Sequence, residues 1–335
     1  MSASRVGTAF LNKAKLPVSG LHGAKCKHSK AKSTSKRPPT KPPRTRANPQ
    51  IDDLHLKPKP KSMSPRLMTF FGVSFLGIGT YCGYLYASYK REVAYSKTLE
   101  VSKDVSDRYN KTARQFDADV DMSEYLMGMG SKRRDLIQMA RGNVLEVSCG
   151  TGRNLSYYEL PGKKSRPELE GCRTVTFVDL SPQMVEITRE KFQKLYPGIK
   201  RVAFWVKNAG EVIPPAAWGK EAGKEASYYD TIVQTMGICS MPDPVETLRH
   251  LGSITEPEKG RILLLEHGRS YYGWLNNILD NTAAAHADRH GCWWNRDIGE
   301  IVRESGLEIV EEKRWHFGTT WRYVLRPRRK DTGGS

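Results

Sequence analysis

The sequence predicts an α/β fold in which a mostly parallel, seven-stranded sheet has helices on both faces and is preceded by a single transmembrane helix. Three observations predict it. Short apolar runs alternate with helical stretches from about residue 103 onward, an uncharged apolar stretch runs from Leu67 to Tyr89, and a glycine-containing turn follows the first apolar run. Such alternation is typical of parallel sheets, because a helix must return the chain to the starting edge between successive strands.

Seven apolar runs are short enough to be strands: 143–147, 174–178, 201–206, 229–234, 260–265, 307–314 and 321–325. Ser181-Pro182 opens a helix with a capping hydroxyl and a proline at the first helical position, and Pro197-Gly198 ends it. Only residues 315–320 join the last two strands, so we expect these to pair antiparallel at an edge of the sheet. The predicted folded domain covers residues 103–327.

The net charge of +18 lies mainly before this domain. Residues 1–66 hold sixteen Lys or Arg and two acidic residues, a net charge of +14, whereas the remaining 269 residues hold thirty-eight basic and thirty-four acidic groups, a net charge of +4. The basic excess is therefore a tail. A basic domain face that follows phosphates is not indicated, which disfavours nucleic acid as a partner.

The leader has the composition of a mitochondrial transit peptide. Residues 1–51 contain no Asp or Glu and are rich in Lys, Arg, Ser and Thr. We expect a transit peptide over residues 1–36 and a disordered, basic, Pro-rich linker over 37–66; a disordered basic tail throughout is the alternative, and the two are compatible. Residues 328–335 are predicted to be a second disordered tail.

The stretch from Leu67 to Tyr89 is predicted to span a membrane. As a helix its 23 uncharged residues reach ~34 Å, enough to cross a bilayer core. A buried globular helix and a signal-peptide core are the alternatives, which fit its length and its position after a long basic leader less well. Eight basic residues lie between Arg37 and Arg66, so the positive-inside rule places the N-terminal side in the matrix. We therefore expect a single-pass protein of the mitochondrial inner membrane whose large domain faces the intermembrane space.

The first predicted strand leads into a turn that contains Gly150 and Gly152. Glycines there let the backbone approach a ligand, and we expect a helix N-terminus behind the turn to present free N–H groups. As a dinucleotide-binding GxGxxG the turn has Leu155 in place of the third glycine. As the GxGxG of methyltransferases it has Ser148 in place of the first. Each pattern lacks one glycine, so the neighbouring residues must decide.

Four neighbouring features favour the methyltransferase pattern. A carboxylate lies two residues before the turn, another ends the second strand where it can accept hydrogen bonds from a ribose, a methionine follows beside the expected adenine site, and an amide follows the third strand. These residues are Glu146, Asp179, Met184 and Asn208, the last in the segment Asn208-Ala209-Gly210-Glu211. Asp179 would serve NAD equally well. Ligands bind at this edge of open parallel sheets, beyond the carboxyl ends of the strands.

Residues Tyr109 to Pro327 resemble a class I S-adenosylmethionine (SAM)-dependent methyltransferase of the UbiE-like group and, more narrowly, the fungal mitochondrial inner-membrane methyltransferase-like proteins of the Oms family. The motifs that carry the resemblance are VLEVSCGTGRN (144–154), TFVDLSPQM (176–184), YDTIVQTMGICSMPDP (229–244), ILLLEHGRS (262–270) and HADRHGCWWNRDI (286–298). The resemblance implies a Rossmann-like sheet and SAM as the cofactor. The cofactor-binding residues that we expect are Glu146, Ser148, Gly150, Gly152, Asn154, Asp179, Met184, Asn208, Ala209 and Gln234.

Methyl transfer needs little beyond alignment and exclusion of water, because the sulfonium is already activated. An acceptor with an acidic proton would need a general base, for which we name His267 and His290. His286, Trp293 and Trp294 are the candidates for the acceptor pocket. Hydrogen-bonded interior histidines and core tryptophans are the alternative for the same residues.

No metal site is predicted. His286 and His290 share a helix face near Cys292, but the three lie in one short segment without a second cluster of ligands. The six cysteines contain no CxxC pair, and we expect reduced, mostly buried thiols.

The sequence thus predicts a SAM-dependent methyltransferase anchored in the mitochondrial inner membrane and acting on a small or lipophilic acceptor such as a quinone-like or thiol compound. Two alternatives remain. Ser148 and Asn208 depart from the family pattern, which leaves open a catalytically degenerate assembly or stability factor whose partners are inner-membrane protein complexes. A matrix RNA methyltransferase fits the total charge but not its confinement to the leader.

Overall fold

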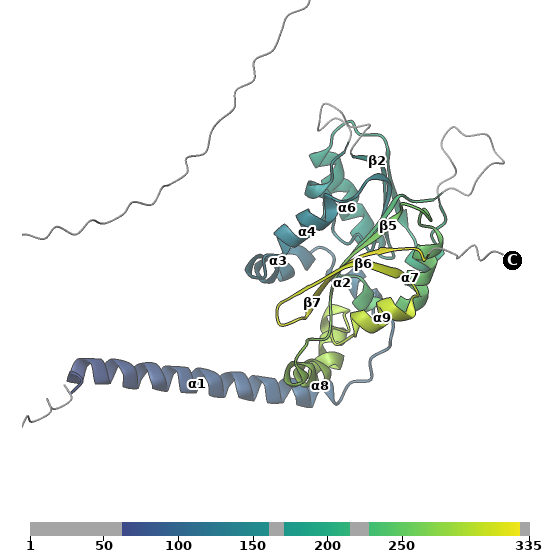
Figure 1. Ribbon diagram of the computed structural model, residues 1–335. Helices are drawn as coiled ribbons and strands as arrows, with labels where there is room; N and C mark the ends of the chain where they lie inside the picture. Colours follow the sequence, from purple (N-terminus) through teal and green to yellow (C-terminus); the bar gives the residue numbers. More distant parts are fainter. Residues whose placement is uncertain (1–61, 161–170, 215–227, 329–335) are drawn as a thin grey trace, which may run out of the picture. The chain divides into compact units, whose positions relative to one another are not determined.

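The computed structural model describes residues 62–160, 171–214 and 228–328 and contains one seven-stranded sheet in the order β3-β2-β1-β4-β5-β7-β6 (Figure 1). The strands end within two residues of the predicted runs: β1 Gly142–Val147, β2 Cys172–Asp179, β3 Val202–Val206, β4 Thr231–Thr235, β5 Arg261–His267, β6 Glu308–Trp315 and β7 Thr320–Arg326. The predicted transit peptide, all but the end of the linker and nearly all of the C-terminal tail lie outside the described residues.

The helices connect these strands as an α/β fold requires. They are α1 Pro65–Ser96, α2 Asp107–Thr112, α3 Phe116–Leu126, α4 Met129–Ile137, α6 Pro182–Leu195, α7 Pro244–Ser253, α8 Gly273–His290 and α9 Ile298–Glu304, with the short 3-10 helices η1 Leu155–Tyr157, η2 Ala209–Glu211 and η3 Ile238–Ser240. The predicted start of α6 is confirmed, because the Ser181 hydroxyl accepts the Met184 N–H at 3.3 Å.

Strands β1 to β5 are parallel to one another, so their carboxyl ends meet at one edge of the sheet. The predicted antiparallel pairing of the last two strands is confirmed, and β6 forms the outer edge. The last strand, β7, lies between β6 and β5 and is antiparallel to both. The sheet is therefore mixed at one side only.

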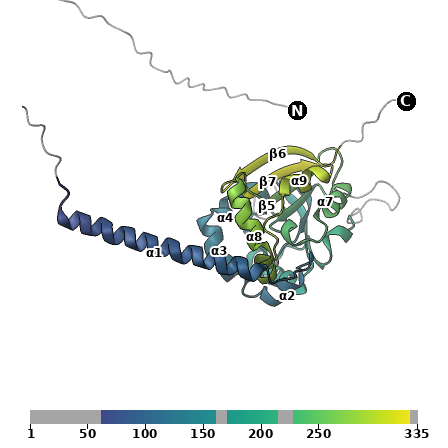
Figure 2. The same cartoon turned by 90° about the horizontal axis from the view of Figure 1, so that it is seen from below.

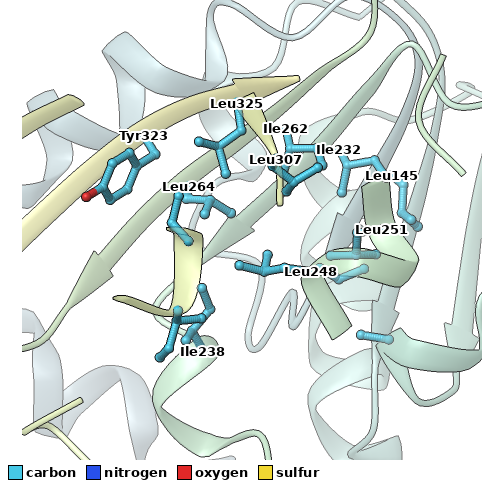
Figure 3. Close-up of a cluster of buried hydrophobic side chains, with 14 of the residues drawn as sticks. Leu145, Ile232, Ile238, Leu248, Leu251, Ile262, Leu264, Leu307, Tyr323 and Leu325 are labelled. Carbon is cyan, nitrogen blue, oxygen red and sulfur yellow. The ribbon is translucent and has the colours of Figure 1, made fainter. Parts of the chain in front are cut away.

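Helices cover both faces of the sheet, as predicted. Leu145 of β1 points to the face on which Leu248 and Leu251 of α7 pack, together with apolar side chains of α9 (Figure 3). Its neighbour Val144 points to the opposite face, where Leu136 of α4 and Phe192 of α6 pack. Successive side chains of a strand point to opposite faces, so the consecutive apolar residues Val144 and Leu145 supply one core each.

Helix α1 is longer than the predicted span of residues 67–89. It begins at Pro65 and continues through Lys90 and Arg91 to Ser96. Its apolar stretch is exposed, and the helix is long and apolar enough to cross a membrane. The extra turns are explained by contact with α8 (Figure 2). Arg289 forms a two-pronged ion pair with Glu92 at 2.7 and 2.8 Å, and the Tyr95 hydroxyl donates to Asp288 at 3.2 Å. Lys90 and Arg91 end the apolar stretch, but charged residues do not end a helix whose next turns have a partner to pack on.

Candidate functional site

A cavity of about 160 Å³ lies at the carboxyl ends of β1, β2 and β4. Gly150 lines it from the turn after β1, Asp179 from the end of β2 and Thr235 from the end of β4. The sequence predicts the ligand site at this edge of the sheet, because the loops that follow parallel strands meet there.

The turn after β1 brings its backbone to the cavity. Gly150 and Gly152 both have left-handed φ angles, +55° and +76°. A Cβ atom on Gly152 would lie 2.6 Å from Leu155 Cδ1 and would have to displace it, whereas a Cβ on Gly150 would meet no atom within 4 Å. The open space at Gly150 is where a ligand can approach the chain.

The predicted α-helix behind this turn is wrong. The three-residue 3-10 helix η1 stands there, and the residues before it form turns. The Asn154 side chain points inward, where its amide donates to Glu146 at 3.0 Å and to Thr235 at 2.9 Å. These side-chain bonds hold the turn, so the N-terminus of a long helix is not the anion-binding element that the sequence suggested.

Asp179 joins two segments at the cavity. Its Oδ2 atom accepts the Gly150 N–H at 2.9 Å, and its Oδ1 atom accepts the Ser181 N–H at 2.9 Å. Burial raises the pKa of the Asp179 carboxyl, although these two hydrogen bonds oppose the shift. The carboxylate is therefore oriented at the cavity wall, with lone pairs left to accept from a ligand hydroxyl.

Ser148 stands where the family pattern has a glycine, and its backbone is strained. Its φ of +51° is left-handed, a region that costs a residue with a side chain about 1 kcal/mol or more. Gly237, in the loop after β4, leaves room for it: a Cβ on Gly237 would lie 2.6 Å from both the Cβ and the Oγ atoms of Ser148. Both residues line the cavity.

Three further predicted residues line the cavity on the side of β2 and β3: Met184, Asn208 and Ala209. The Asn208 side-chain oxygen accepts the Gly210 N–H at 3.0 Å. This bond holds the loop after β3 and orients the Asn208 side-chain amide. Asn154 also lines the cavity. The structure thus brings together seven of the ten predicted cofactor residues, Ser148, Gly150, Asn154, Asp179, Met184, Asn208 and Ala209.

Glu146, Gly152 and Gln234 lie behind the cavity lining. Glu146 is fully buried and accepts from Asn154 and from the Tyr158 hydroxyl, the latter at 2.5 Å, and burial raises its pKa to about 7. Gln234 is fully buried as well; its Oε1 atom has no hydrogen-bond partner among the described residues, and its Nε2 atom lies 3.6 Å from Met241 Sδ. Glu146 reaches the cavity only through Asn154.

Arg133 lines the cavity and was missed by the sequence argument. Its side chain is 4% exposed and donates to Asn154 at 3.1 Å and to Thr235 at 2.8 Å, while Glu124 of α3 pairs with it at 2.7 Å. The buried cation therefore has a carboxylate partner, as a desolvated charge requires. Nothing in the local sequence singles out Arg133, because SKRRD is also the pattern of a solvated helix face.

Tyr109 and Ser240 form another part of the lining that the sequence argument missed. The two hydroxyls lie 2.9 Å apart, and the Ser240 hydroxyl also donates to the Gly291 carbonyl at 2.6 Å. Burial raises the pKa of the Tyr109 phenol well above its usual value, so the phenol stays protonated at neutral pH. Both residues lie within the segment 109–327 that resembles a methyltransferase, yet no local sequence pattern indicates that they meet.

The predicted catalytic and acceptor-pocket residues are not among the residues that line the cavity. His290 is exposed at the end of α8, and His267 Nε2 lies 2.7 Å from Cys292 Sγ.

Among the acceptor-pocket candidates, His286 stacks on Trp294 with ring centroids 3.9 Å apart, and burial lowers the pKa of His286 to about 4. The backbone N–H of Trp293 donates to the Cys239 carbonyl at 3.1 Å, whereas its buried indole N–H has no partner among the described residues. The predicted shared face of His286 and His290 is present, with ring centroids 4.8 Å apart. The catalytic and pocket roles stay predictions.

Comparison with known proteins agrees with this geometry. A family model described as a methyltransferase domain matches residues 75–312. The mitochondrial methyltransferase OMS1 of Saccharomyces cerevisiae is 43% identical over 229 residues, which are 67% of this chain and 46% of that protein, so the chain spans about half the length of this curated relative.

Two solved structures are similar at a greater distance. An O-methyltransferase family protein from Burkholderia thailandensis has a TM-score of 0.48 and 17% identity over 73% of this chain and 69% of its own. A SAM-dependent methyltransferase from Aquifex aeolicus has a TM-score of 0.42 and 16% identity over 64% of this chain and 97% of its own.

The sheet order, the glycine turn and the carboxylate at the end of β2 define a SAM-dependent methyltransferase of class I, the class that the sequence predicted. The chain belongs to the methyltransferase domain family. SAM is the cofactor of this class.

The residues at the cavity fit that cofactor. Asp179 offers a carboxylate to ribose hydroxyls, Met184 offers an apolar surface to the adenine, and the backbone at Gly150 is open for close approach. Bound SAM would supply a methyl group on a positively charged sulfur.

Proposed function

We propose that this chain is a membrane-anchored mitochondrial methyltransferase that transfers a methyl group from SAM to a small or lipophilic acceptor. The observation that carries the proposal is Asp179, whose carboxylate is held at the cavity wall by the N–H groups of Gly150 and Ser181. A carboxylate so fixed at the carboxyl ends of β1 and β2 is suited to a ribose.

The cavity also supports the class of acceptor. Phe116, Met236, Met241 and Pro242 give part of the lining an apolar character, while Tyr109 adds a hydroxyl that is protonated at neutral pH. Such a wall suits a flat or aliphatic molecule better than a charged polymer. The residues of this chain would then act by orienting the acceptor and excluding water, which supply most of the acceleration in methyl transfer.

The location rests on two features. The relative from Saccharomyces cerevisiae is named as mitochondrial, and α1 has an exposed apolar stretch of membrane-spanning length. The end of α1 packs on α8, so the anchor and the catalytic domain meet through Glu92 and Arg289. We propose the inner membrane, with the large domain in the intermembrane space, from the distribution of basic residues in the leader.

Two experiments test the function: the first measures SAM binding, and the second measures methyl transfer from SAM to an acceptor. The purified full chain in detergent is titrated with SAM by calorimetry and then incubated with methyl-labelled SAM and extracts that contain quinones, thiols and lipids. We expect saturable binding and label in an organic-soluble small molecule. Label in RNA or protein would contradict the acceptor class. Absence of SAM binding would favour the alternative, an assembly or stability factor for inner-membrane complexes, which the serine at position 148 leaves open.

The anchor is tested separately. Alkaline carbonate extraction of mitochondria that contain the full chain should leave it in the membrane pellet, and deletion of residues 65–88 should release it. Protease added to mitoplasts should digest the large domain. A domain protected there but digested after membrane lysis would place it in the matrix.

A further inference from the structure

Cys239, His267 and Cys292 meet beside the cavity although they lie far apart in the sequence. One potential ligand atom of each lies within 4.8 Å of the other two. Cys239 belongs to η3 after β4, His267 ends β5, and Cys292 follows the end of α8. Both thiols are buried, at 1% and 4% exposure. The fold, and no local spacing, assembles this group.

In the sequence, Cys292 is close to His286 and His290 instead. In the structure the His286 ring faces the backbone at Cys292, where Nδ1 lies 2.9 Å from the carbonyl oxygen, and His290 is exposed. The thiol of Cys292 turns the other way, toward His267 Nε2 at 2.7 Å. The expectation of no metal site therefore rested on a different set of residues.

We propose that Cys239, His267 and Cys292 bind one Zn²⁺ ion. Two thiolates and one imidazole are a ligand set that binds zinc in preference to harder divalent cations. Zinc bonds to sulfur at about 2.3 Å and to nitrogen at about 2.0 Å, so tetrahedral ligand atoms lie roughly 3.5 to 3.8 Å apart. The present group reaches that arrangement if His267 and Cys292 separate by about 1 Å.

Charge balance supports zinc at this buried position. Binding releases one proton from each thiol, and the two thiolates neutralise the two charges of the ion while the imidazole stays neutral. A buried ion without such compensation would be strongly disfavoured. The zinc cluster would therefore be neutral overall, as an interior site requires.

The surroundings orient the ligands and offer a fourth position. The Ser240 hydroxyl lies 3.6 Å from Cys239 Sγ and already bonds to Tyr109 and Gly291, so we expect a water beside it as the fourth ligand. Hydrogen bonds to the backbone hold both cysteines: the backbone N–H of Trp293 donates to the Cys239 carbonyl, and His286 Nδ1 lies 2.9 Å from the Cys292 carbonyl oxygen. Groups of this kind behind the ligands usually raise metal affinity.

The position gives the ion a structural role at the cavity. Gly237 and Ser240 line the cavity from the loop that contains Cys239, and Ser240 bonds to Gly291, the neighbour of Cys292. An ion at this point ties the loop after β4, the end of β5 and the segment after α8 together. Zinc would hold the wall that carries the Tyr109 and Ser240 hydroxyls, without taking part in methyl transfer.

The test measures metal content, which does not depend on methyltransferase activity. The full chain is purified in detergent with a thiol reductant, and its zinc is measured by inductively coupled plasma mass spectrometry. We expect about one Zn²⁺ per chain, and a loss of at least about tenfold in Cys239→Ser and in Cys292→Ser. Cys172→Ser is the matched control, because Cys172, at the start of β2, is equally buried but donates to the carbonyl of Ala140, which precedes β1.

A second measurement covers the case in which the variants fail to fold. The wild-type chain is stripped with a chelator and refilled with Zn²⁺ or Co²⁺. We expect the melting temperature to fall on stripping and to return with zinc, and cobalt to give the charge-transfer band of bound thiolate. Zinc content no higher than in Cys239→Ser, a cobalt spectrum without that band, or a Cys239–Cys292 disulfide in the purified protein would overturn the proposal.

Discussion

Asp179 Oδ2 accepts the backbone N–H of Gly150 at 2.9 Å and thereby joins the end of β2 to the glycine turn after β1. The bond connects two residues that the sequence indicates separately. Asp179 is expected to accept hydrogen bonds from a ribose, and Gly150 is expected to let the backbone approach the ligand. Its geometry makes them one unit, because a change at the carboxylate also releases the turn.

Asp179→Asn should weaken SAM binding by roughly ten- to a hundredfold, the loss of one charge-assisted hydrogen bond to the ribose. Calorimetric titration of the full chain measures it. Asp230→Asn is the matched control, since Asp230 also accepts a backbone N–H, that of Asn143 at 2.7 Å, but at the opposite end of the sheet. Equal affinity loss in both variants would mean that Asp179 acts through stability alone.

Ser148→Gly should raise the free energy of unfolding by about 1 kcal/mol, because glycine adopts the left-handed backbone at φ +51° without strain. Gly237→Ala should lower it by about 1–3 kcal/mol, since the new Cβ meets the Ser148 side chain at 2.6 Å. The cost of Gly237→Ala should shrink when Ser148 is already glycine. Urea unfolding of the four proteins of this cycle is the measurement, and strictly additive effects would contradict the contact.

Glu146 should make the protein less stable as the pH rises from about 4.5 to about 7. Its pKa is raised to about 7 by burial, so the folded protein keeps the proton over a range in which the unfolded chain has lost it. The stability lost across that range is about 3 kcal/mol. Glu146→Gln carries no proton to lose, so its stability relative to the wild type should increase over this range. A difference between the two proteins that does not change with pH would refute the assignment.

Tyr109→Phe should lower kcat by about tenfold once an acceptor is known, because it removes a hydroxyl that lines the cavity and is fixed by Ser240. His290→Ala should change kcat by less than about twofold, since this side chain is exposed at the end of α8. A large loss in His290→Ala would contradict this expectation and support the predicted role of His290 as the general base. Steady-state kinetics at saturating SAM compares the two variants.

Much of the fold could be predicted because its determinants are local. Val144 and Leu145 are consecutive apolar residues and Val147 follows them, which is the pattern of a strand buried on both faces. Ser181 and Pro182 carry the start of α6 in two adjacent residues. The prediction of an α-helix behind the glycine turn is wrong, because Asn154 bonds to Glu146 and Thr235 there. The partners of a side chain are not visible in the local sequence pattern.

The sequence by itself determined the sheet, the glycine turn, Asp179 and the apolar helix, since each depends on residue types within a few positions of one another. Only the tertiary structure decided that Arg133, Tyr109 and Ser240 line the cavity, that the end of α1 packs on α8, and that Cys239, His267 and Cys292 meet. These contacts join residues tens to hundreds of positions apart. Their geometry follows from how the helices pack on the sheet, which no short stretch of sequence encodes.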